Sequence, residues 1–408
     1  MFSHLERPHR PPPSLREVLA DLGPRHAANG FVGWVFSATA PVAIILSVGS
    51  GGGLSEAELA SWIFGVFCIN GLISLLFCWL YREPLGFAWT IPGTVLVGPA
   101  LTHLRFEEVV GAYVATGALM LLLGATGWVK RAMQAVPMPI VMGMVAGVFL
   151  RFGVDLVRAL HADAAIAAPM VLVWLTLSAL PALGRRVPPL IGALLTGALA
   201  IALLGRLDGS SLSAIEWARP VVQAPAWSVA AMLELVVPLS ITVLVVQNGQ
   251  GFAVLKAARH DPPIDAITVA CGIGTLASAS VGSVCTCLTG PTNAILTSSG
   301  ERERQYTAGI CFGLLGVLFG LLSPAFTRLM LNTPKAFIMA LAGLAMLRVL
   351  QTAFITAFKD RFSFGALVAF LVTVADLAIW NIGSAFWGLA TGLLVSWLQE
   401  RKDFADTA

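Results

Sequence analysis

Charged side chains are scarce in this sequence, where Asp, Glu, Lys and Arg together make up 12% of 408 residues. Soluble domains carry about twice that share. Apolar residues make up 57% of the chain, and its mean hydropathy is +0.84. A single water-soluble domain is therefore excluded, because it would have to bury apolar runs that recur from one end of the chain to the other. The solvent for most of this chain is lipid.

Motifs of enzymes and nucleotide-driven pumps are missing as well. The sequence has no H-E-x-x-H, no P-loop and no glycine-rich dinucleotide fingerprint after a strand. The six histidines are scattered over loops, and Cys285-x-Cys287 has no second ligand pair, so we expect no metal site. The six cysteines lie in apolar runs, where disulfides are not expected. We therefore expect no enzymatic activity and no cofactor, and the lack of a basic stripe excludes nucleic acid as a partner.

Apolar segments of about 20 residues, the length that a membrane-spanning helix needs, recur along the whole chain. They predict an all-α polytopic membrane protein with about 14 transmembrane segments: 30–48, 58–81, 88–101, 108–127, 136–154, 168–183, 187–204, 230–256, 264–278, 281–298, 306–325, 334–351, 363–378 and 382–398. Segments 3 and 10 are short and interrupted by Gly and Pro. Residues 1–29 are polar and rich in proline, which predicts a cytoplasmic N-terminal segment with a short interfacial helix near 14–22, not a signal peptide.

Basic residues are distributed unevenly over the loops between these segments. If the N-terminus is cytoplasmic, seventeen Lys and Arg residues fall on the inner side and six on the outer side. The six are Arg105, Arg158, Arg206, Arg219, Arg328 and Lys335. Cytoplasmic loops of membrane proteins carry such an excess of positive charge. The split predicts an even number of spans, with both termini in the cytoplasm.

A faint internal repeat links the two halves of the chain. Three pairs of motifs share a spacing of 197 or 199 residues: Arg131-x-Met133-x-x-x-Pro137 with Arg328-x-Met330-x-x-x-Pro334, Leu150-Arg151 with Leu347-Arg348, and Thr90-x-Pro92 with Thr289-x-Pro291. Arg and Pro are rare inside membranes, so these matches favour a true repeat; chance matches are the alternative. The spacing covers seven spans, an odd number, so the second copy must enter the membrane upside down. Inverted repeats are typical of secondary transporters.

The repeat divides the chain into two sets of seven segments. Residues 30–204 are predicted to form the first inverted repeat and residues 230–398 the second. A periplasmic loop at 205–229 joins them, and residues 399–408 form a cytoplasmic tail. This 7+7 organisation, with segments 3 and 10 broken by short strands, is the fold that we expect.

The two broken segments carry the Thr-x-Pro motifs at corresponding places in the halves. Residues 87–91 predict a short strand before a half-helix that begins at 92–93, and residues 287–290 predict the same before Pro291. Backbone N–H and C=O groups that lack helical hydrogen bonds are tolerated at membrane depth only where the chain lines a cavity or is buried in protein. Two half-helices whose N-termini meet there favour the binding of an anion, above all a carboxylate. The alternative is that both segments are ordinary kinked helices. The candidate substrate-binding residues are Trp89, Thr90, Ile91, Gly93, Thr289, Gly290, Thr292 and Asn293.

Segment 8 supplies a third group of candidates, because residues 247–250 contain three amide side chains. Amides inside hydrocarbon are costly unless they bind something. Contact with substrate is the favoured role, and hydrogen bonds between helices are the alternative. The candidates here are Gln247, Asn248 and Gly251, and those in the first span, just before its proline, are Ser37 and Thr39.

Few ionisable residues fall within the predicted spans. Glu234 lies near the outer end of segment 8, which predicts that its carboxylate reaches toward water. Arg151 and Asp155 stand four residues apart on one helix face and are expected to pair. Asp376 is expected to be structural rather than a proton relay. No acidic residue falls at the candidate site, so the sequence identifies no proton carrier.

A further set of short motifs touches both halves of the chain. They are Phe370-Leu371-Val372-Thr373, Ile382-Gly383-Ser384-Ala385-Phe386-Trp387-Gly388-Leu389, Leu150-Arg151-Phe152-Gly153, Trp89-Thr90-x-Pro92-Gly93, and Gln247-Asn248-x-x-Gly251 followed by Lys256-Ala257-Ala258. This set resembles the benzoate:proton symporter (BenE) family, which is distantly similar to uracil-permease-type transporters. The stretch 282–293 departs from the family pattern, which has a histidine and a run of alanines there.

The resemblance implies a core domain of segments 1–4 and 8–11 and a gate domain of segments 5–7 and 12–14, with the substrate between them. It further implies a secondary transporter of the bacterial inner membrane that imports benzoate or a similar aromatic carboxylate by proton symport with alternating access. A nucleobase or inorganic-anion carrier on the same scaffold is the alternative; a channel or a membrane-embedded enzyme is remote. The expected partners are a small anionic substrate, protons and the lipid bilayer, and a homodimer is compatible with the sequence.

A topology reporter fused after Ala408 tests the predicted orientation. A fluorescent protein that folds only in the cytoplasm should be bright at this position, because the excess of basic residues holds that side of the chain inside. A phosphatase that is active only in the periplasm serves as the control and should be silent. Activity of the phosphatase fusion alone would overturn both the orientation and the even number of spans.

Overall fold

The computed structural model describes residues 5–129, 131, 137–184, 187–206, 216–298, 300–377, 379–380, 382 and 384–405. In the N-terminal half, its elements are α1 Leu15–Asp21, α2 Pro24–Ala38, α3 Ala40–Gly51, α4 Glu56–Phe64, η1 Gly65–Ile69, α5 Asn70–Tyr81, β1 Phe87–Trp89, α6 Ile91–Ala100, α7 Phe106–Thr126, α9 Met138–Ala162, α10 Ala164–Ala179, α11 Pro181–Gly184 and α12 Pro189–Leu203.

In the C-terminal half, the elements are α13 Val229–Ala231, η3 Met232–Val236, α14 Val237–Ile241, η4 Thr242–Asn248, α15 Gly249–Ala257, α16 Ile264–Ala279, β2 Thr286–Leu288, α17 Gly290–Leu296, η5 Arg302–Arg304, α18 Tyr306–Leu321, α19 Ser323–Leu331, α20 Lys335–Phe358, α21 Ser363–Val374, α22 Ser384–Gln399 and α23 Arg401–Ala405. The stretch from α13 to α15 is one long helix with two π-helical turns, η3 and η4. Such turns are frequent at functional sites.

Seven helices of the described residues are long and apolar enough to cross a membrane. They are Pro24–Gly51, Glu56–Tyr81, Phe106–Thr126, Met138–Ala162, Val229–Ala257, Arg302–Leu321 and Lys335–Phe358. Five further apolar helices, α6, α10, α12, α16 and α21, have only 10–17 residues. The chain is therefore a mostly helical multi-pass protein, as its hydropathy predicts, and the figure of fourteen spans stays a prediction.

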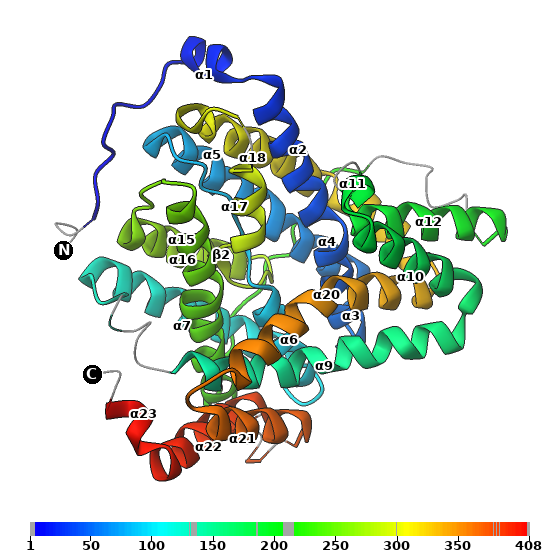
Figure 1. Cartoon of the computed structure of the whole chain (residues 1–408), viewed down its shortest axis with the longest axis vertical. Helices are drawn as coiled ribbons and strands as arrows, with labels where there is room; N and C mark the ends of the chain where they lie inside the picture. The colour runs from blue at the N-terminus through cyan, green and yellow to red at the C-terminus, as the bar shows by residue number, and fades with distance from the viewer. Residues whose placement is uncertain are drawn as a thin grey trace.

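The short helix predicted near residues 14–22 is confirmed as α1. The Ser14 hydroxyl accepts a hydrogen bond from the Glu17 N–H, and the Glu17 carboxylate accepts one from the Ser14 N–H, which together form a capping box. These contacts with Ser14, and a weaker one with Arg82, hold the pKa of the Glu17 carboxyl below its ordinary value. A polar helix on the surface of the molecule is thus fixed at its start (Figure 1).

The two strands meet in the interior, although almost 200 residues separate them. They pair antiparallel, with Phe87 opposite Leu288, Ala88 opposite Cys287 and Trp89 opposite Thr286. Every residue of both strands is buried. Backbone N–H and C=O groups that are withdrawn from water must find partners, and here each strand supplies the partners of the other. A short helix then begins close after each strand, α6 at Ile91 and α17 at Gly290.

Small residues let the long helices approach closely. A side chain at Gly143 of α9 would lie 2.3 Å from the Ala366 carbonyl oxygen of α21, and one at Gly272 of α16 would lie 2.6 Å from the Leu121 nitrogen of α7. Close packing through glycine is typical of helices in membranes. In Figure 1, α9, α10, α12 and α20 form one side of the molecule, while both chain ends lie on the other side.

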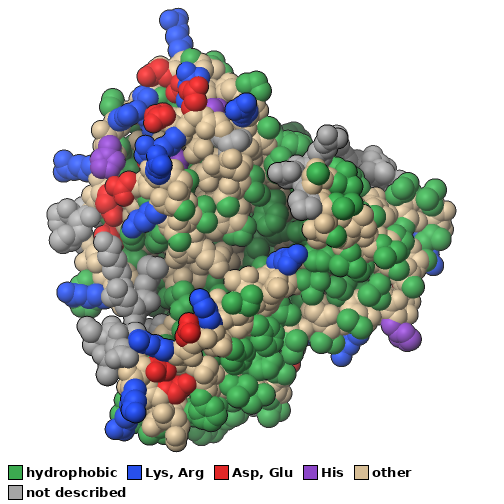
Figure 2. All heavy atoms as spheres, viewed as in Figure 1, with side chains coloured by type: hydrophobic (Ala, Val, Ile, Leu, Met, Phe, Trp, Pro, Cys, Tyr) green, Lys and Arg blue, Asp and Glu red, His purple; other side chains and the backbone are tan. Residues whose placement is uncertain are grey.

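The surface separates charge from apolar area. In Figure 2, the Lys, Arg, Asp and Glu side chains gather on the side where the chain ends lie, and the lower right of the view is mostly hydrophobic. Large apolar side chains are exposed on many spans, for example Leu76, Leu122, Leu195, Leu318 and Ile355. Exposed apolar area of this extent fits contact with lipid rather than with water. A recess with hydrophobic side chains opens between the upper body and the right-hand arm (Figure 2).

Candidate functional site

A cavity of about 470 Å³ lies where segments from both halves of the chain meet. We call it the Trp89 cavity. Its wall is formed by residues of α2, α3, β1, α6, η4, α15 and α17, together with residues of α9 and α20. Sites for small molecules are typically clefts of 300–1,000 Å³, so the Trp89 cavity has room for a ligand of this class.

Seven of the thirteen candidate residues line the Trp89 cavity: Ser37, Trp89, Ile91, Gln247, Thr289, Gly290 and Thr292. The other six are not part of its lining: Thr39, Thr90, Gly93, Asn248, Gly251 and Asn293. Residues from three distant parts of the sequence are thus brought together around one cavity. The substrate contacts themselves stay predictions.

Two equivalent threonines behave differently at the starts of α6 and α17. The hydroxyl of Thr90 accepts a hydrogen bond from the Gly93 N–H at 3.0 Å and so caps α6. Thr289 stands 199 residues later but makes no capping hydrogen bond. Its buried hydroxyl has no partner within the described part of the chain, and the residue lines the Trp89 cavity. The first turn of α17 therefore lacks the side-chain cap that Thr90 gives to α6.

Two more polar side chains at the wall of this cavity have no hydrogen-bond partner among the described residues. The indole N–H of Trp89, a residue that is 2% exposed, is unpaired. The amide of Gln247, a residue that is 7% exposed, makes no hydrogen bond that the structure records. A buried polar group without a partner costs about 1–3 kcal/mol. With the Thr289 hydroxyl, these groups form a set of polar side chains at the cavity wall that have no hydrogen-bond partner among the described residues.

The amides of Asn248 and Asn293 have structural partners instead. The Asn248 side-chain oxygen accepts the Leu288 N–H at 2.8 Å and so holds β2 against η4. The Asn293 amide accepts the Gly86 N–H at 2.9 Å and donates to the Gly86 carbonyl at 3.0 Å. It also donates to the Thr289 carbonyl at 2.7 Å. Both asparagines tie the broken segments to their surroundings.

Arg348 is the lining residue that sequence reasoning missed. It lies on α20 and is the one charged side chain among the described residues that line the Trp89 cavity. Its guanidinium donates to the Gln351 side-chain oxygen at 3.0 Å and lies 5.9 Å from the centre of the Trp174 ring. The signal was present in the sequence, because an arginine inside an apolar span is a functional candidate by default.

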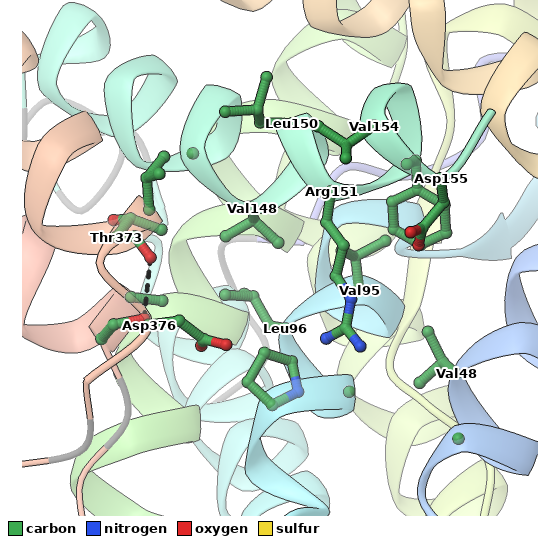
Figure 3. A pocket seen from close by; sticks show the side chains of 18 of the residues that line it. Val48, Val95, Leu96, Val148, Leu150, Arg151, Val154, Asp155, Thr373 and Asp376 are labelled. Carbon is green, nitrogen blue, oxygen red and sulfur yellow. Dashed lines mark hydrogen bonds between the residues drawn. The ribbon is translucent and has the colours of Figure 1, made fainter. Parts of the chain in front are cut away.

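A second cavity, of about 340 Å³, lies between α3 and α6 on one side and α9, α21 and α22 on the other (Figure 3). We call it the Arg151 cavity. Glu234 of η3 belongs to its wall and is only 3% exposed, so the prediction that this carboxylate reaches toward water is wrong. It pairs with His103 at 2.9 Å between Nε2 and the carboxylate oxygen. The sequence could not show this, because residues 103 and 234 come from different halves.

The predicted pair of Arg151 with Asp155 is also wrong. Asp155 instead accepts a hydrogen bond from Arg158 at 3.1 Å, one turn further along α9. In Figure 3, Arg151 extends from α9 into the cavity toward Val95 of α6. Spacings of three and four residues both bring side chains together on a helix, so spacing alone did not decide between the two arginines. Within the described residues, no group of three His, Cys, Asp or Glu side chains is placed to hold a metal ion.

Comparison of the sequence with known families gives one match across nearly the whole chain. The model of the BenE family, described as benzoate membrane transport protein, matches residues 20–398. The inner membrane protein YdcO of Escherichia coli (strain K12) is 30% identical over 92% of this chain and 95% of its own length. The benzoate membrane transport protein of Acinetobacter baylyi (strain ATCC 33305 / BD413 / ADP1) is 28% identical over 90% of this chain and 92% of its own length.

Solved structures with the same fold are transporters of other families. Two structures of SLC26A9, one of them the murine anion transporter in the inward-facing state, have TM-scores of 0.62 and 0.63 at 12% and 13% identity. The matches cover 91% of this chain and 64% and 68% of those chains, so this chain spans about two thirds of their length. The transmembrane domain of the cyanobacterial bicarbonate transporter BicA has a TM-score of 0.53 at 16% identity, over 91% of this chain and 98% of that domain. The likeness shows a transmembrane transporter fold.

The neighbouring amides Gln247 and Asn248 give a matched pair of variants. Asn248→Ala should lower the free energy of unfolding by about 1–3 kcal/mol, because the buried Leu288 N–H loses its acceptor. Gln247→Ala should change stability little, because its side chain bonds no described residue. Thermal unfolding of both purified variants in detergent checks this. Equal melting temperatures for the two variants would contradict the division into a structural and a cavity-facing amide.

Proposed function

Because this chain belongs to the benzoate membrane transport protein family, we propose that it is a secondary transporter that imports a small organic anion, with benzoate or a similar aromatic carboxylate as its substrate. The bound anion occupies the Trp89 cavity. The protein carries it across the bacterial inner membrane by alternating access, in which the cavity opens first to one side and then to the other. The name of the Acinetobacter relative and the anion-transporter fold of the structural neighbours support this proposal.

A single positive charge among uncharged lining residues, many of them apolar or aromatic, is the observation that carries the proposal. Arg348 supplies the charge, and Phe36, Trp89 and Phe149 supply aromatic surface. An aromatic carboxylate matches both parts, since its ring packs on the apolar wall and its two oxygens suit a planar guanidinium. A neutral nucleobase would leave the guanidinium without a counter-charge. An inorganic anion such as bicarbonate would leave the apolar wall without a partner.

The carboxylate also satisfies the unpaired polar groups of the wall. The Thr289 hydroxyl, the Trp89 indole N–H and the Gln247 amide can each donate a hydrogen bond to an anion in the cavity. These three groups belong to segments 10, 3 and 8, and Arg348 lies on α20, in segment 12. An anion held by both sets links the proposed core domain to the proposed gate domain, the two parts that alternating access moves relative to each other. Gly290 lets α17 pack closely on α15, because a Cβ there would lie 2.8 Å from Gln250 Cβ.

We further propose the arrangement of fourteen segments in two inverted repeats of seven. Segments 3 and 10 are broken in this proposal, segments 1–4 and 8–11 form the core domain, and segments 5–7 and 12–14 form the gate domain. The pairing of β1 with β2, each followed closely by a short helix, supports a repeat that brings two equivalent segments together. Both termini are proposed to face the cytoplasm.

Import is proposed to be coupled to protons, and we assign the proton to Glu234. Its carboxylate is buried in the wall of the Arg151 cavity, pairs with His103 and lies in the π-helical turn η3. Buried ionisable pairs inside spans are typical of proton relays. The other charged residues of that wall are Arg151, Asp155, Arg158 and Asp376.

Thermal stability in the presence of candidate substrates tests the substrate class. Benzoate should raise the melting temperature of the purified protein, whereas uracil and bicarbonate should not, because a ligand stabilises the state that it binds. Arg348→Gln should weaken benzoate binding by about tenfold to a hundredfold, the effect of losing a hydrogen bond to a charged group. Arg348→Lys, which keeps the positive charge but not the planar guanidinium, should bind benzoate more weakly than the wild-type protein and more tightly than Arg348→Gln. A shift with uracil or bicarbonate and none with benzoate would establish the alternative carrier.

Uptake into proteoliposomes tests the assignment of the proton. The wild-type protein should accumulate benzoate when the outside is made acidic, and Glu234→Gln should still equilibrate benzoate but no longer accumulate it, because a neutral amide carries no proton. His103→Gln, which removes the partner of Glu234, should weaken the dependence on the pH gradient. Accumulation by Glu234→Gln at the wild-type level would exclude Glu234 as the carrier.

A further inference from the structure

The two cavities are lined by positions that correspond in the two halves of the chain. On α20, the Trp89 cavity is lined by Arg348, Val349 and Thr352. The residues 197 positions earlier, which line the Arg151 cavity, are Arg151, Phe152 and Asp155. The Trp89 cavity is also lined by Val246, Gln247 and Gln250. The residues 199 positions earlier, which line the Arg151 cavity, are Ser47, Val48 and Gly51. These are the two spacings of the motifs that repeat in the sequence.

The cavities also lie toward opposite ends of the spans. The Trp89 cavity is lined by Ser37, in the middle of the helix Pro24–Gly51, and by Val254, near the end of the helix Val229–Ala257. The Arg151 cavity is lined by Gly51, at the end of the first of these helices, and by Glu234, near the start of the second. The two helices are therefore antiparallel, and a ligand that leaves one cavity toward the other moves along them.

Neither repeat-related arginine has a carboxylate partner. Arg348 bonds only the neutral side chain of Gln351 among the described residues. Arg151 makes no hydrogen bond and no ion pair with any part of the chain that the structure describes, although Asp155 stands four residues away. Arg158 bonds this carboxylate and so keeps it from Arg151. The guanidinium of Arg151 instead points into its cavity, between α9 and α6 (Figure 3).

Both arginine side chains are exposed, and neither has a counter-charge among the described residues. An arginine inside an apolar span is a functional candidate, and two of them at equivalent positions, each lining a cavity, fit an anion at both. We infer that the Arg151 cavity is a second carboxylate site, at which Arg151 is the anion-binding residue and the counterpart of Arg348. A substrate that enters from the side of the Arg151 cavity is bound first by Arg151, passes to the Trp89 cavity and is released past Arg348. The inference rests on the proposed function and names a second site for the same substrate.

Benzoate transport measured separately from the two membrane faces tests this inference. Intact cells and inverted membrane vesicles give the KM for each direction. Arg151→Gln should raise the KM by about tenfold to a hundredfold for entry from the side of the Arg151 cavity, and much less for entry from the other side. Arg348→Gln should show the opposite asymmetry. Arg151→Lys should restore most of the affinity, because a cation at this position is what the anion needs.

Arg219→Gln is the matched control, because Arg219 is an exposed arginine that lines neither cavity. It should leave both KM values unchanged. A KM for Arg151→Gln that is unchanged from both faces, or raised equally from both, would overturn the second site while leaving the proposed function intact. Absence of benzoate transport by the wild-type protein in cells and in vesicles would instead overturn the proposed function, and the second carboxylate site with it.

Discussion

The pairing of β1 with β2 is the contact on which the rest of this structure depends. A helix that stops at membrane depth leaves backbone groups without partners, and the hydrocarbon offers none. Here each strand of three residues takes its partners from the other, across the two halves of the chain. The pairing fixes where α6 and α17 begin and so brings the wall residues Trp89 and Thr289 to the same cavity. Without it, the buried backbone groups of both strands would have no partners.

Polar side chains around this pairing divide into two groups with different tasks. Asn248, Asn293 and Thr90 bond backbone groups of the broken segments and stabilise them. Trp89 and Thr289 have buried polar atoms that no described residue satisfies. The framework is thus stabilised by one set of polar side chains, and the proposed ligand binding uses another.

The sequence predicted the positions of this cluster better than it predicted roles within it. Interruption by Gly and Pro indicated strands near residues 87–91 and 287–290, and the structure has them at Phe87–Trp89 and Thr286–Leu288. Gln247 and Asn248 were not distinguishable, because neighbours on a helix point about 100° apart and the sequence does not state which direction faces the cavity. The strand that bonds Asn248 lies 40 residues away along the chain. Burial of Glu234 and the place of Arg348 likewise depend on helices from the other half.

A structure determined with bound 4-iodobenzoate would show whether the Trp89 cavity binds an aromatic carboxylate, because the anomalous signal of iodine locates the ring without ambiguity. We expect the iodine against the apolar wall that α9 contributes to the Trp89 cavity, near Met142 and Val145. The carboxylate should lie within hydrogen-bond distance of the Thr289 hydroxyl and be directed toward Arg348. Iodine outside the Trp89 and Arg151 cavities, or a carboxylate turned away from both arginines, would contradict the account.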